Sequence, residues 1–313
     1  MKPFQNLSKS IKAKNPISIF TKNLSNFPLD SRNITNDLIS IFTKQPFSSN
    51  NPELESLAPL LNTKVVETVL NGLKNWKIAL HFFTWASNQG PYKHNVYAYN
   101  AMASILSHAR QKAPLRALSM DVVNSRCLMS PGALGFLIRC LGNAGLVVEA
   151  NLLFDEVQKM GLCVPNSYSY TCLLEVLSKS SCIDLIEMRL KEMNDHGWGF
   201  DKYTLTPVLQ VYCNTAEFDK ALDVFNEIHN RGWVDEYVFS ILVLAFSKWG
   251  KESRVDKALH LFDKMKKSGF APDISLYDVI IGGLCVNKDV KKALCLYSEM
   301  KEFKIQPDAK NCY

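Results

Sequence analysis

The segment Asp256–Cys285, DKALHLFDKMKKSGFAPDISLYDVIIGGLC, predicts two amphipathic helices joined by a turn. Apolar residues recur at helical spacing in each half of it, which is the pattern of a helix with one buried face. Between the halves, Gly269 supplies a helix stop and Pro272 follows three residues later. Asp273 can then cap the second helix. Two such short helices cannot bury their apolar faces alone, so the segment predicts neighbours of the same kind.

The same pattern recurs along the chain with a period of about 35 residues. Within the segment, Ala258 and Phe262 mark the buried face of the first helix. Their counterparts elsewhere are Ala79 and Phe83, Ala150 and Phe154, Ala221 and Phe225, and Ala293 and Tyr297. A weaker copy has Ile186 and Leu190 at these places. A fixed period of this length is typical of a helical solenoid, in which stacked repeats share one continuous core.

The period divides the chain into repeats of two helices each. Residues 51–95 form a divergent, aromatic-rich first repeat that we expect to cap the array. Six full repeats follow at 96–130, 131–166, 167–201, 202–235, 236–273 and 274–308, and residues 309–313 start a truncated one. We expect Pro114 to interrupt the second helix of full repeat 1, and about three extra residues near Gly250 to lie in the inter-helix turn of full repeat 5. No polar capping helix follows, which predicts either a longer array or a partner over the last apolar face.

The first 50 residues differ in charge from the rest of the chain. They carry seven basic and two acidic residues, so +5 of the total net charge of +6 belongs to them. This segment is rich in Lys, Ser and Asn, which is typical of an organelle transit peptide, although a disordered basic leader is the alternative. A mitochondrial destination is favoured over a plastid one. Because the repeats themselves are almost neutral, the overall basicity is poor evidence for nucleic-acid binding.

The sequence shows no pattern of a catalytic, metal or membrane protein. Its nine cysteines form no CxxC pair, and most lie in helical stripes, as buried free thiols do in a reducing compartment. The six histidines lack metal-ligand spacing, and no phosphate-binding loop or nucleophile motif occurs. No apolar run reaches the roughly 20 residues of a membrane helix. We therefore expect no enzyme activity, cofactor, metal, small-molecule substrate or membrane span.

The repeats agree in the residues at particular positions as well as in length. The segments Ala150–Asn166 and Ala258–Asp273 agree at several places, and Tyr97–Met102, Ser169–Leu174 and Ile280–Cys285 agree as parts of first helices. These features resemble the plain type of the pentatricopeptide repeat, a plant organelle family, well over 96–308 and weakly over 52–95. The resemblance implies a right-handed superhelix of antiparallel helix pairs. It further implies a concave face that binds single-stranded organellar RNA at about one base per repeat.

The resemblance also implies which residues read the bases. In that family the fifth residue of a repeat and the last residue before the next repeat act together. The corresponding pairs here are Asn100 with Ser130, Gly135 with Asn166, Thr171 with Asp201, Thr206 with Asp235, Ser240 with Asp273, and Asp278 with Asp308. By family preference the two Thr/Asp pairs would read guanine, the Ser/Asp pair guanine more weakly, and the Asn/Ser pair cytosine. Gly135 has no side chain to read with, and the Asp/Asp pair sets two carboxylates beside a phosphate-rich ligand.

Each of these residues also has a purely structural interpretation. The pairs' last residues could be helix caps and nothing more, and their fifth residues could be exposed helix-start polar groups. Where the family has a residue that wedges between bases, this chain has tyrosines that could stack on bases or be partly buried: Tyr97, Tyr168, Tyr203 and Tyr237. Lys179 and Lys248 could touch phosphates or simply be solvated.

Two functions follow from the resemblance. The first is an RNA-binding adaptor that acts in RNA processing, stability or translation in an organelle. The alternative is a helical scaffold that binds the proteins of an RNA-processing or ribosomal complex and reads little RNA itself. The near-neutral repeats and the uncovered last face favour the scaffold, whereas the Thr/Asp pairs favour the adaptor.

Overall fold

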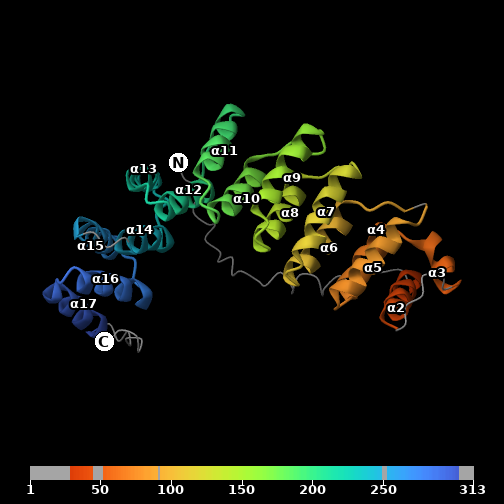
Figure 1. The fold of residues 1–313 in the computed structure, drawn as a ribbon, viewed down its shortest axis with the longest axis horizontal. Coiled ribbons are helices and arrows are strands. Elements are labelled where there is room, and N and C mark those ends of the chain that lie inside the picture. Colours follow the sequence, from red (N-terminus) through yellow and green to blue (C-terminus); the bar gives the residue numbers. More distant parts are fainter. Residues whose placement is uncertain (1–28, 45–51, 91, 249–251, 303–313) are drawn as a thin grey trace, which may run out of the picture. The chain divides into compact units, whose positions relative to one another are not determined.

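The computed structural model describes residues 29–44, 52–90, 92–248 and 252–302, with the side chains of 29–32 and 252–254 left aside. All regular structure within these residues is helical, which confirms the predicted all-α repeat solenoid (Figure 1). The right-handed sense of the superhelix stays a prediction. The described residues divide after Ile105 into two compact units.

The N-terminal unit contains a helix that the sequence analysis did not predict. Its elements are α2 (Leu29–Thr43), α3 (Pro52–Leu57), the 3₁₀ turn η2 (Ala58–Leu60), α4 (Thr63–Gly72), α5 (Trp76–Ser87) and most of α6 (Val96–His108). Helix α2 lies within the range assigned to the leader, yet it packs on α4 and α5. Phe42 of α2 is buried, and its ring centroid lies 5.1 Å from that of Phe82 and 5.5 Å from that of Trp85. The leader is therefore helical from Leu29 to Thr43, where an apolar face covers the first repeat.

The C-terminal unit consists of alternating first and second helices. The first helices after α6 are α8 (Pro131–Asn143), α10 (Ser167–Ser178), α12 (Lys202–Asn214), α14 (Glu236–Lys248) and α16 (Ile274–Val286). The second helices are α7 (Lys112–Asn124), α9 (Val147–Lys159), α11 (Ile183–Asp195), α13 (Phe218–Asn230), α15 (Glu252–Lys267) and α17 (Val290–Glu302). From α8 to α16, each first helix packs directly against the next first helix. In full repeats 2 to 6 the second helix packs on its own first helix, as Figure 1 shows.

Aromatic pairs join several repeats to the next in the core. Phe154 packs on Tyr170 of the following repeat with ring centroids 4.9 Å apart. Phe262 packs on Tyr277 in the same way at 5.0 Å. The alanines four residues before these phenylalanines are fully buried, as small side chains are in a close-packed core. The Ala/Phe pattern that revealed the period is thus the packing between helices.

Two kinds of turn among the described repeats contain residues with positive φ angles. At the end of a second helix the residue is glycine in four repeats, as predicted for Gly269, and arginine in full repeat 1: Gly161, Gly197, Gly232, Gly269 and Arg126. Between the helices of a repeat, the positive-φ residues are Arg110, Gly145, Ser181, Ala216 and Lys288, of which one is glycine. We did not predict the left-handed conformation in the turn between the helices, because residues other than glycine give no sequence signal of it.

Two local expectations were wrong. Helix α7 runs from Lys112 to Asn124 without a break, since Pro114 is its third residue and the N–H groups of a first turn need no intrahelical partner. Helix α15 begins at Glu252 and has 16 residues, whereas α13 has 13, so at least part of the three-residue excess lies in the helix rather than in the turn. In the described chain, every helix is too short or too polar to span a membrane.

Candidate functional site

The candidate tyrosines are exposed at the starts of first helices. The exposed fraction is 44% for Tyr168, 69% for Tyr203 and 61% for Tyr237, and in the N-terminal unit it is 60% for Tyr97. These side chains are thus open to a ligand rather than covered by neighbours. In α10, α12 and α14 the tyrosine stands three residues before the candidate reading residue, so both lie on the same side of the helix. In α12 and α14 an exposed ring and a half-buried polar group therefore share one surface, whereas in α10 the polar group is buried.

Thr171 and Asp201 are brought together by a third residue, Thr204. The hydroxyl of Thr204 donates to Asp201 Oδ1 over 2.8 Å and lies 3.3 Å from the hydroxyl of Thr171. The backbone N–H of Thr204 also donates to Asp201 Oδ1 over 2.8 Å, so Asp201 caps α12. Thr171 is only 5% exposed, whereas Asp201 is exposed. The pair implied by the resemblance is therefore one hydrogen-bonded chain across a repeat boundary.

Thr206 and Asp235 have the same residue types but different partners. The hydroxyl of Thr206 donates to the backbone carbonyl of Lys202 over 2.7 Å. Asp235 Oδ1 accepts the backbone N–H of Val238 over 3.0 Å, and Asp235 Oδ2 accepts the Lys202 ammonium. Partial burial of Asp235 works to raise its pKa, but the hydrogen bonds from Lys202 and Val238 outweigh it and lower the pKa. Asp235 is therefore an ion-paired helix cap.

The fifth and sixth pairs are less complete. Ser240 donates to the Glu236 carbonyl over 2.8 Å, and Asp273 caps α16 by accepting the Leu276 N–H over 2.9 Å. Asp278 is half-buried on α16. Its implied partner, Asp308, lies outside the described residues, as do 309–313 and the whole of residues 1–28.

At the second pair, a neighbouring ring fills the space beside Gly135. A Cβ atom at Gly135 would lie 2.8 Å from Tyr168 Cε1 and 2.8 Å from Cys172 Sγ. Arg139 donates to the Tyr168 hydroxyl over 2.9 Å and to Glu175 over 3.0 Å, which fixes the ring. The other member, Asn166, caps α10 in a box with Ser169. Beside Gly135, Arg139 of the same repeat and Tyr168 of the next therefore stand where the other repeats present a short polar group.

The two residues of the first pair belong to different units. Asn100 is half-buried, and its Oδ1 atom is buried with no hydrogen-bond partner among the described residues. Ser130 is exposed and caps α8 by accepting the Ala133 N–H over 3.3 Å. In all five described pairs, the last residue is thus a helix cap, which is the structural role that the sequence left open.

The structure adds residues that the sequence analysis missed. Thr204 and Lys202 hold the two Thr/Asp pairs, and Arg139 orients Tyr168. The sequence held a clue to one of these contacts. Lys202 precedes Asp235 by nearly one repeat, so the two residues stand at the starts of neighbouring first helices. Lys179 is the C-terminal cap residue of α10, and Lys248 ends α14.

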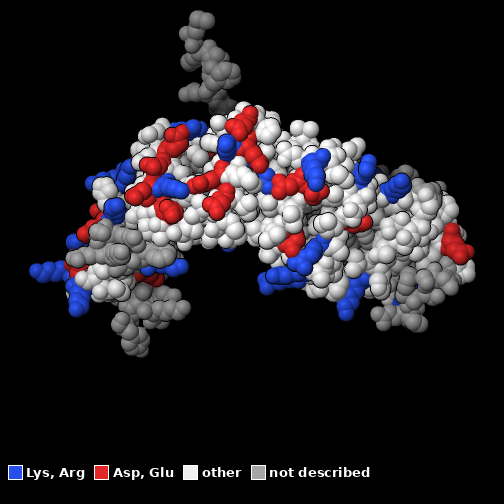
Figure 2. All heavy atoms as spheres, turned by 45° about the horizontal axis from the view of Figure 1, so that its top comes forward, with Lys and Arg blue, Asp and Glu red and all other residues white. Residues whose placement is uncertain are grey.

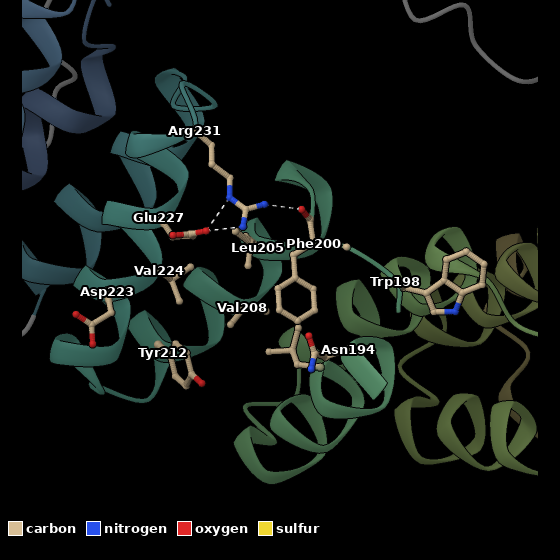
Figure 3. A pocket seen from close by; sticks show the side chains of 12 residues that line it. Asn194, Trp198, Phe200, Leu205, Val208, Tyr212, Asp223, Val224, Glu227 and Arg231 are labelled. Carbon is tan, nitrogen blue, oxygen red and sulfur yellow. Dashed lines mark hydrogen bonds and ion pairs between the residues drawn. The ribbon is translucent and has the colours of Figure 1, made fainter. Parts of the chain in front are cut away.

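The second helices of three repeats form a separate acidic surface. Helices α9, α11 and α13 carry ten acidic and four basic residues, and Figure 2 shows acidic side chains gathered there. Between α11 and α13 lies an open pocket of about 600 Å³ whose floor includes Leu205 and Val208 of α12 (Figure 3). Arg231 is paired with Glu227 at its edge, whereas Asp223 has no hydrogen-bond or ion-pair partner in the described chain.

The cysteines and histidines show no sign of a metal centre in the part of the chain that is described. Cys127, Cys140, Cys163, Cys172 and Cys213 are buried free thiols, Cys182 is half-buried, and Cys285 and Cys295 are exposed. Burial raises the pKa of Cys140 and of Cys213 to about 12, so both are inert thiols. Within the described residues, no group of three potential ligands is placed to hold a metal ion.

The repeats match models of a known family. The model described as PPR repeat matches residues 135–162, 203–233 and 237–270, and the model described as PPR repeat family matches 272–310. A mitochondrial pentatricopeptide repeat-containing protein of Arabidopsis thaliana is 60% identical over 249 residues, covering 79% of this chain and 30% of that protein. Another from the same plant, also named mitochondrial, is 27% identical over 78% of this chain and 42% of its own length.

Solved structures agree in fold. The crystal structure of the pentatricopeptide repeat protein PPR10 from maize matches with a TM-score of 0.61 at 21% identity, over 90% of this chain and 40% of that one. The same protein in complex with an 18-nucleotide psaJ RNA element matches with a TM-score of 0.59 at 20% identity, over 90% of this chain and 44% of that one. The chain spans less than half the length of these relatives. The recurring helix pairs, the repeat models and the 60% identical relative together show that this chain belongs to the pentatricopeptide repeat family.

Proposed function

We propose that this chain binds single-stranded RNA along the face formed by its first helices, at about one base per repeat. The observation that carries the proposal is the meeting of Thr171 and Asp201 on Thr204. Two polar groups of the third full repeat converge there on a residue of the fourth, and Tyr168 and Tyr203 at the starts of the same two first helices are exposed. A base could stack on a ring and present its edge to the polar groups, as single-strand binding requires.

The charge of this face suits a nucleic acid held by stacking and edge contacts. Helices α8, α10 and α12 carry one acidic and two basic residues, in contrast to the acidic second helices. Phosphates would meet little repulsion on the first-helix side. The maize relative was solved with an RNA element, which favours the same ligand class. The relatives named mitochondrial favour a role in that organelle, in RNA processing, stability or translation.

Binding to short RNAs tests this proposal. Fluorescence anisotropy would compare a labelled 12-nucleotide RNA with three central guanines against the same RNA with adenines there. We expect micromolar or tighter binding of the guanine RNA, weakening as salt rises because phosphate contacts release counterions. A variant with Tyr168, Tyr203 and Tyr237 changed to alanine should lose binding but keep its helical circular dichroism. Equal, salt-independent binding of both RNAs by both proteins would rule the proposal out.

The acidic second-helix surface supports a second candidate, a scaffold for proteins. The pocket between α11 and α13 has an apolar floor, and at its edge lies Asp223, which has no partner among the residues that the structure describes. That chemistry fits a protein segment with an apolar anchor flanked by lysine or arginine, and it repels RNA. The pocket's position on the second helices would allow both ligands at once.

A matched pair of peptides tests the scaffold. One peptide carries a central tryptophan and leucine flanked by lysines, and the other has glutamates in place of the lysines. We expect the basic peptide alone to bind, and Asp223→Asn or Val224→Arg to weaken it. A variant at a remote acid, Asp263→Asn, serves as the control. Equal binding of both peptides, or loss of binding only in the control, would exclude this surface as the docking site.

A further inference from the structure

The third and fourth full repeats carry the same Thr/Asp pair in sequence, but their polar groups have different hydrogen-bond partners. The pairs are Thr171 with Asp201 and Thr206 with Asp235. A reading rule based on residue types alone treats them as equal. Their side chains, however, have different atoms left for a ligand.

The pair of the third repeat offers only hydrogen-bond acceptors. Thr204 spends its single hydroxyl proton on Asp201 Oδ1, so in the 3.3 Å contact between the two threonines Thr171 must be the donor. Thr171 then has only lone pairs left. Asp201 uses Oδ1 for the two bonds from Thr204, and its Oδ2 atom has no partner among the described residues.

The pair of the fourth repeat offers donors as well. Both oxygens of Asp235 are engaged, Oδ1 by the Val238 N–H and Oδ2 by the Lys202 ammonium. An ammonium has three N–H donors, of which this bond uses one. Thr206 gives its proton to the Lys202 carbonyl and can only accept. Lys202 therefore places a positive donor on the carboxylate oxygen that the third repeat leaves open.

These differences matter for the choice of base. The Watson–Crick edge of guanine has two adjacent donors, N1–H and N2–H₂, which fit a surface of acceptors only. An ammonium beside the carboxylate can donate to the carbonyl oxygens of uracil, cytosine or guanine alike. A site that leaves polar groups unpaired with the wrong ligand discriminates most strongly. The third repeat meets that condition for guanine, and the fourth repeat does not.

We propose that Lys202 is a specificity-determining residue, which makes the fourth repeat less selective for guanine than the third although both carry threonine and aspartate. This inference rests on the proposed RNA binding. No other full repeat has a lysine at its first position, where the residues are Val96, Pro131, Ser167, Glu236 and Ile274. The effect is therefore particular to one base position.

A base-substitution series measures the effect. RNAs that differ in one base are bound to the wild-type chain, and the positions read by the two repeats are assigned from the RNAs whose binding responds to Thr171→Asn or Thr206→Asn. We expect the ratio of guanine affinity to uracil affinity to be about tenfold higher at the third-repeat position. The variant Lys202→Met, which keeps the aliphatic stem, should raise the ratio at the fourth-repeat position towards that value.

A transplant tests the same idea in reverse. Ser167 occupies in α10 the first position that Lys202 occupies in α12. Ser167→Lys should lower the guanine-to-uracil ratio at the third-repeat position. Lys220→Met removes an equal charge from α13, where Lys220 pairs with Glu187, and should change neither ratio. Circular dichroism checks that each variant stays folded.

The outcomes separate this inference from the proposed function. If the wild-type chain binds none of the RNAs, the proposed function fails and the inference fails with it. Binding with equal guanine preference at both positions would overturn the inference alone. So would a Lys202→Met variant that weakens binding to all bases by one common factor, as a plain loss of charge would do.

Discussion

Arg189 of α11 donates a 2.6 Å hydrogen bond to Asp155 of α9, across the boundary between the second and third full repeats. The Arg189 side chain is only 2% exposed, and its guanidinium also donates to Glu192 and Asn151. It lies 5.2 Å from the centre of the Phe154 ring. The partners stabilise the charge of this buried cation. Removal of the cation and removal of its partners should therefore change the free energy of unfolding by different amounts.

We expect removal of the acids to destabilise the fold more than removal of the cation. Asp155→Ala with Glu192→Ala leaves a buried charge without an anion, which costs about 3–5 kcal/mol. Arg189→Met keeps most of the packing and leaves two carboxylates that water can reach, so we expect a smaller loss. Urea unfolding followed by circular dichroism measures both. A larger loss for Arg189→Met would show that packing, rather than charge, dominates this site.

Base preference should depend on the two threonines one position at a time. Thr171→Asn and Thr206→Asn replace a small acceptor with an amide that can also donate, so each should lower the preference for guanine at a single, different position. Binding to RNAs that differ in one base measures this. Unchanged preference in both variants would refute base reading by these residues, even if the chain still binds RNA.

The exposed ring of Tyr203 should contribute to affinity without contributing to stability. Its side chain is 69% exposed, so Tyr203→Ala removes little packing. If a base stacks on it, the variant loses about 1–3 kcal/mol of RNA-binding free energy. Tyr203→Phe keeps the ring and should bind nearly as well. Loss of affinity in Tyr203→Phe would instead point to a hydrogen bond from the hydroxyl.

Two helical glycines should respond oppositely to alanine. A Cβ atom at Gly142 would lie 2.3 Å from Val176 Cγ2 of the next first helix, so Gly142→Ala should cost about 1–3 kcal/mol through overpacking. No atom lies within 4 Å of the same position at Gly282, where alanine should stabilise the helix by about 0.5–1 kcal/mol. Urea unfolding checks both. A stable Gly142→Ala variant would mean that neighbouring first helices can separate slightly.

The Lys202–Asp235 pair should give a small, pH-dependent stability. Because the pKa of Asp235 is lowered in the folded chain, its contribution is present above the ordinary aspartate pKa and is lost as the pH falls through the folded value. Asp235→Asn keeps a helix cap but loses the ion pair, so we expect a deficit of about 0.2–1 kcal/mol at pH 7. Unfolding at pH 3 should show a smaller deficit. A deficit that grows in acid would contradict this assignment.

Features set by local sequence could be predicted, and features set by neighbours could not. The repeat period and most helix ends could be predicted, because they depend on residues within one repeat. The Ala/Phe spacing gives the period, and glycines such as Gly161 and Gly197 end second helices. The turn at Ala216 was not, since its positive φ angle is imposed by the packing of the two helices it joins. Helix α2 was missed because the basic composition around it is that of a leader.

The candidate site divides in the same way. The positions of the tyrosines and of the Thr/Asp pairs follow from the repeat register, and their exposure agrees with that register. The roles of Thr204 and Lys202 depend on contacts between neighbouring first helices, which join residues 33 positions apart in each case. Such contacts require the angle between repeats, which the sequence pattern does not specify.

The unequal packing of the two helix layers has a mechanical consequence. Successive first helices from α8 to α16 pack directly against one another, whereas α9, α11 and α13 are bridged by long side chains such as Arg189 and Lys220. Small rotations between repeats would therefore stretch the outer edge and leave the step from one first helix to the next nearly constant. We expect an RNA strand bound along the first helices to meet binding positions at a fixed spacing. A change of register would then require nucleotides to bulge out of the strand, because the spacing between repeats would not change.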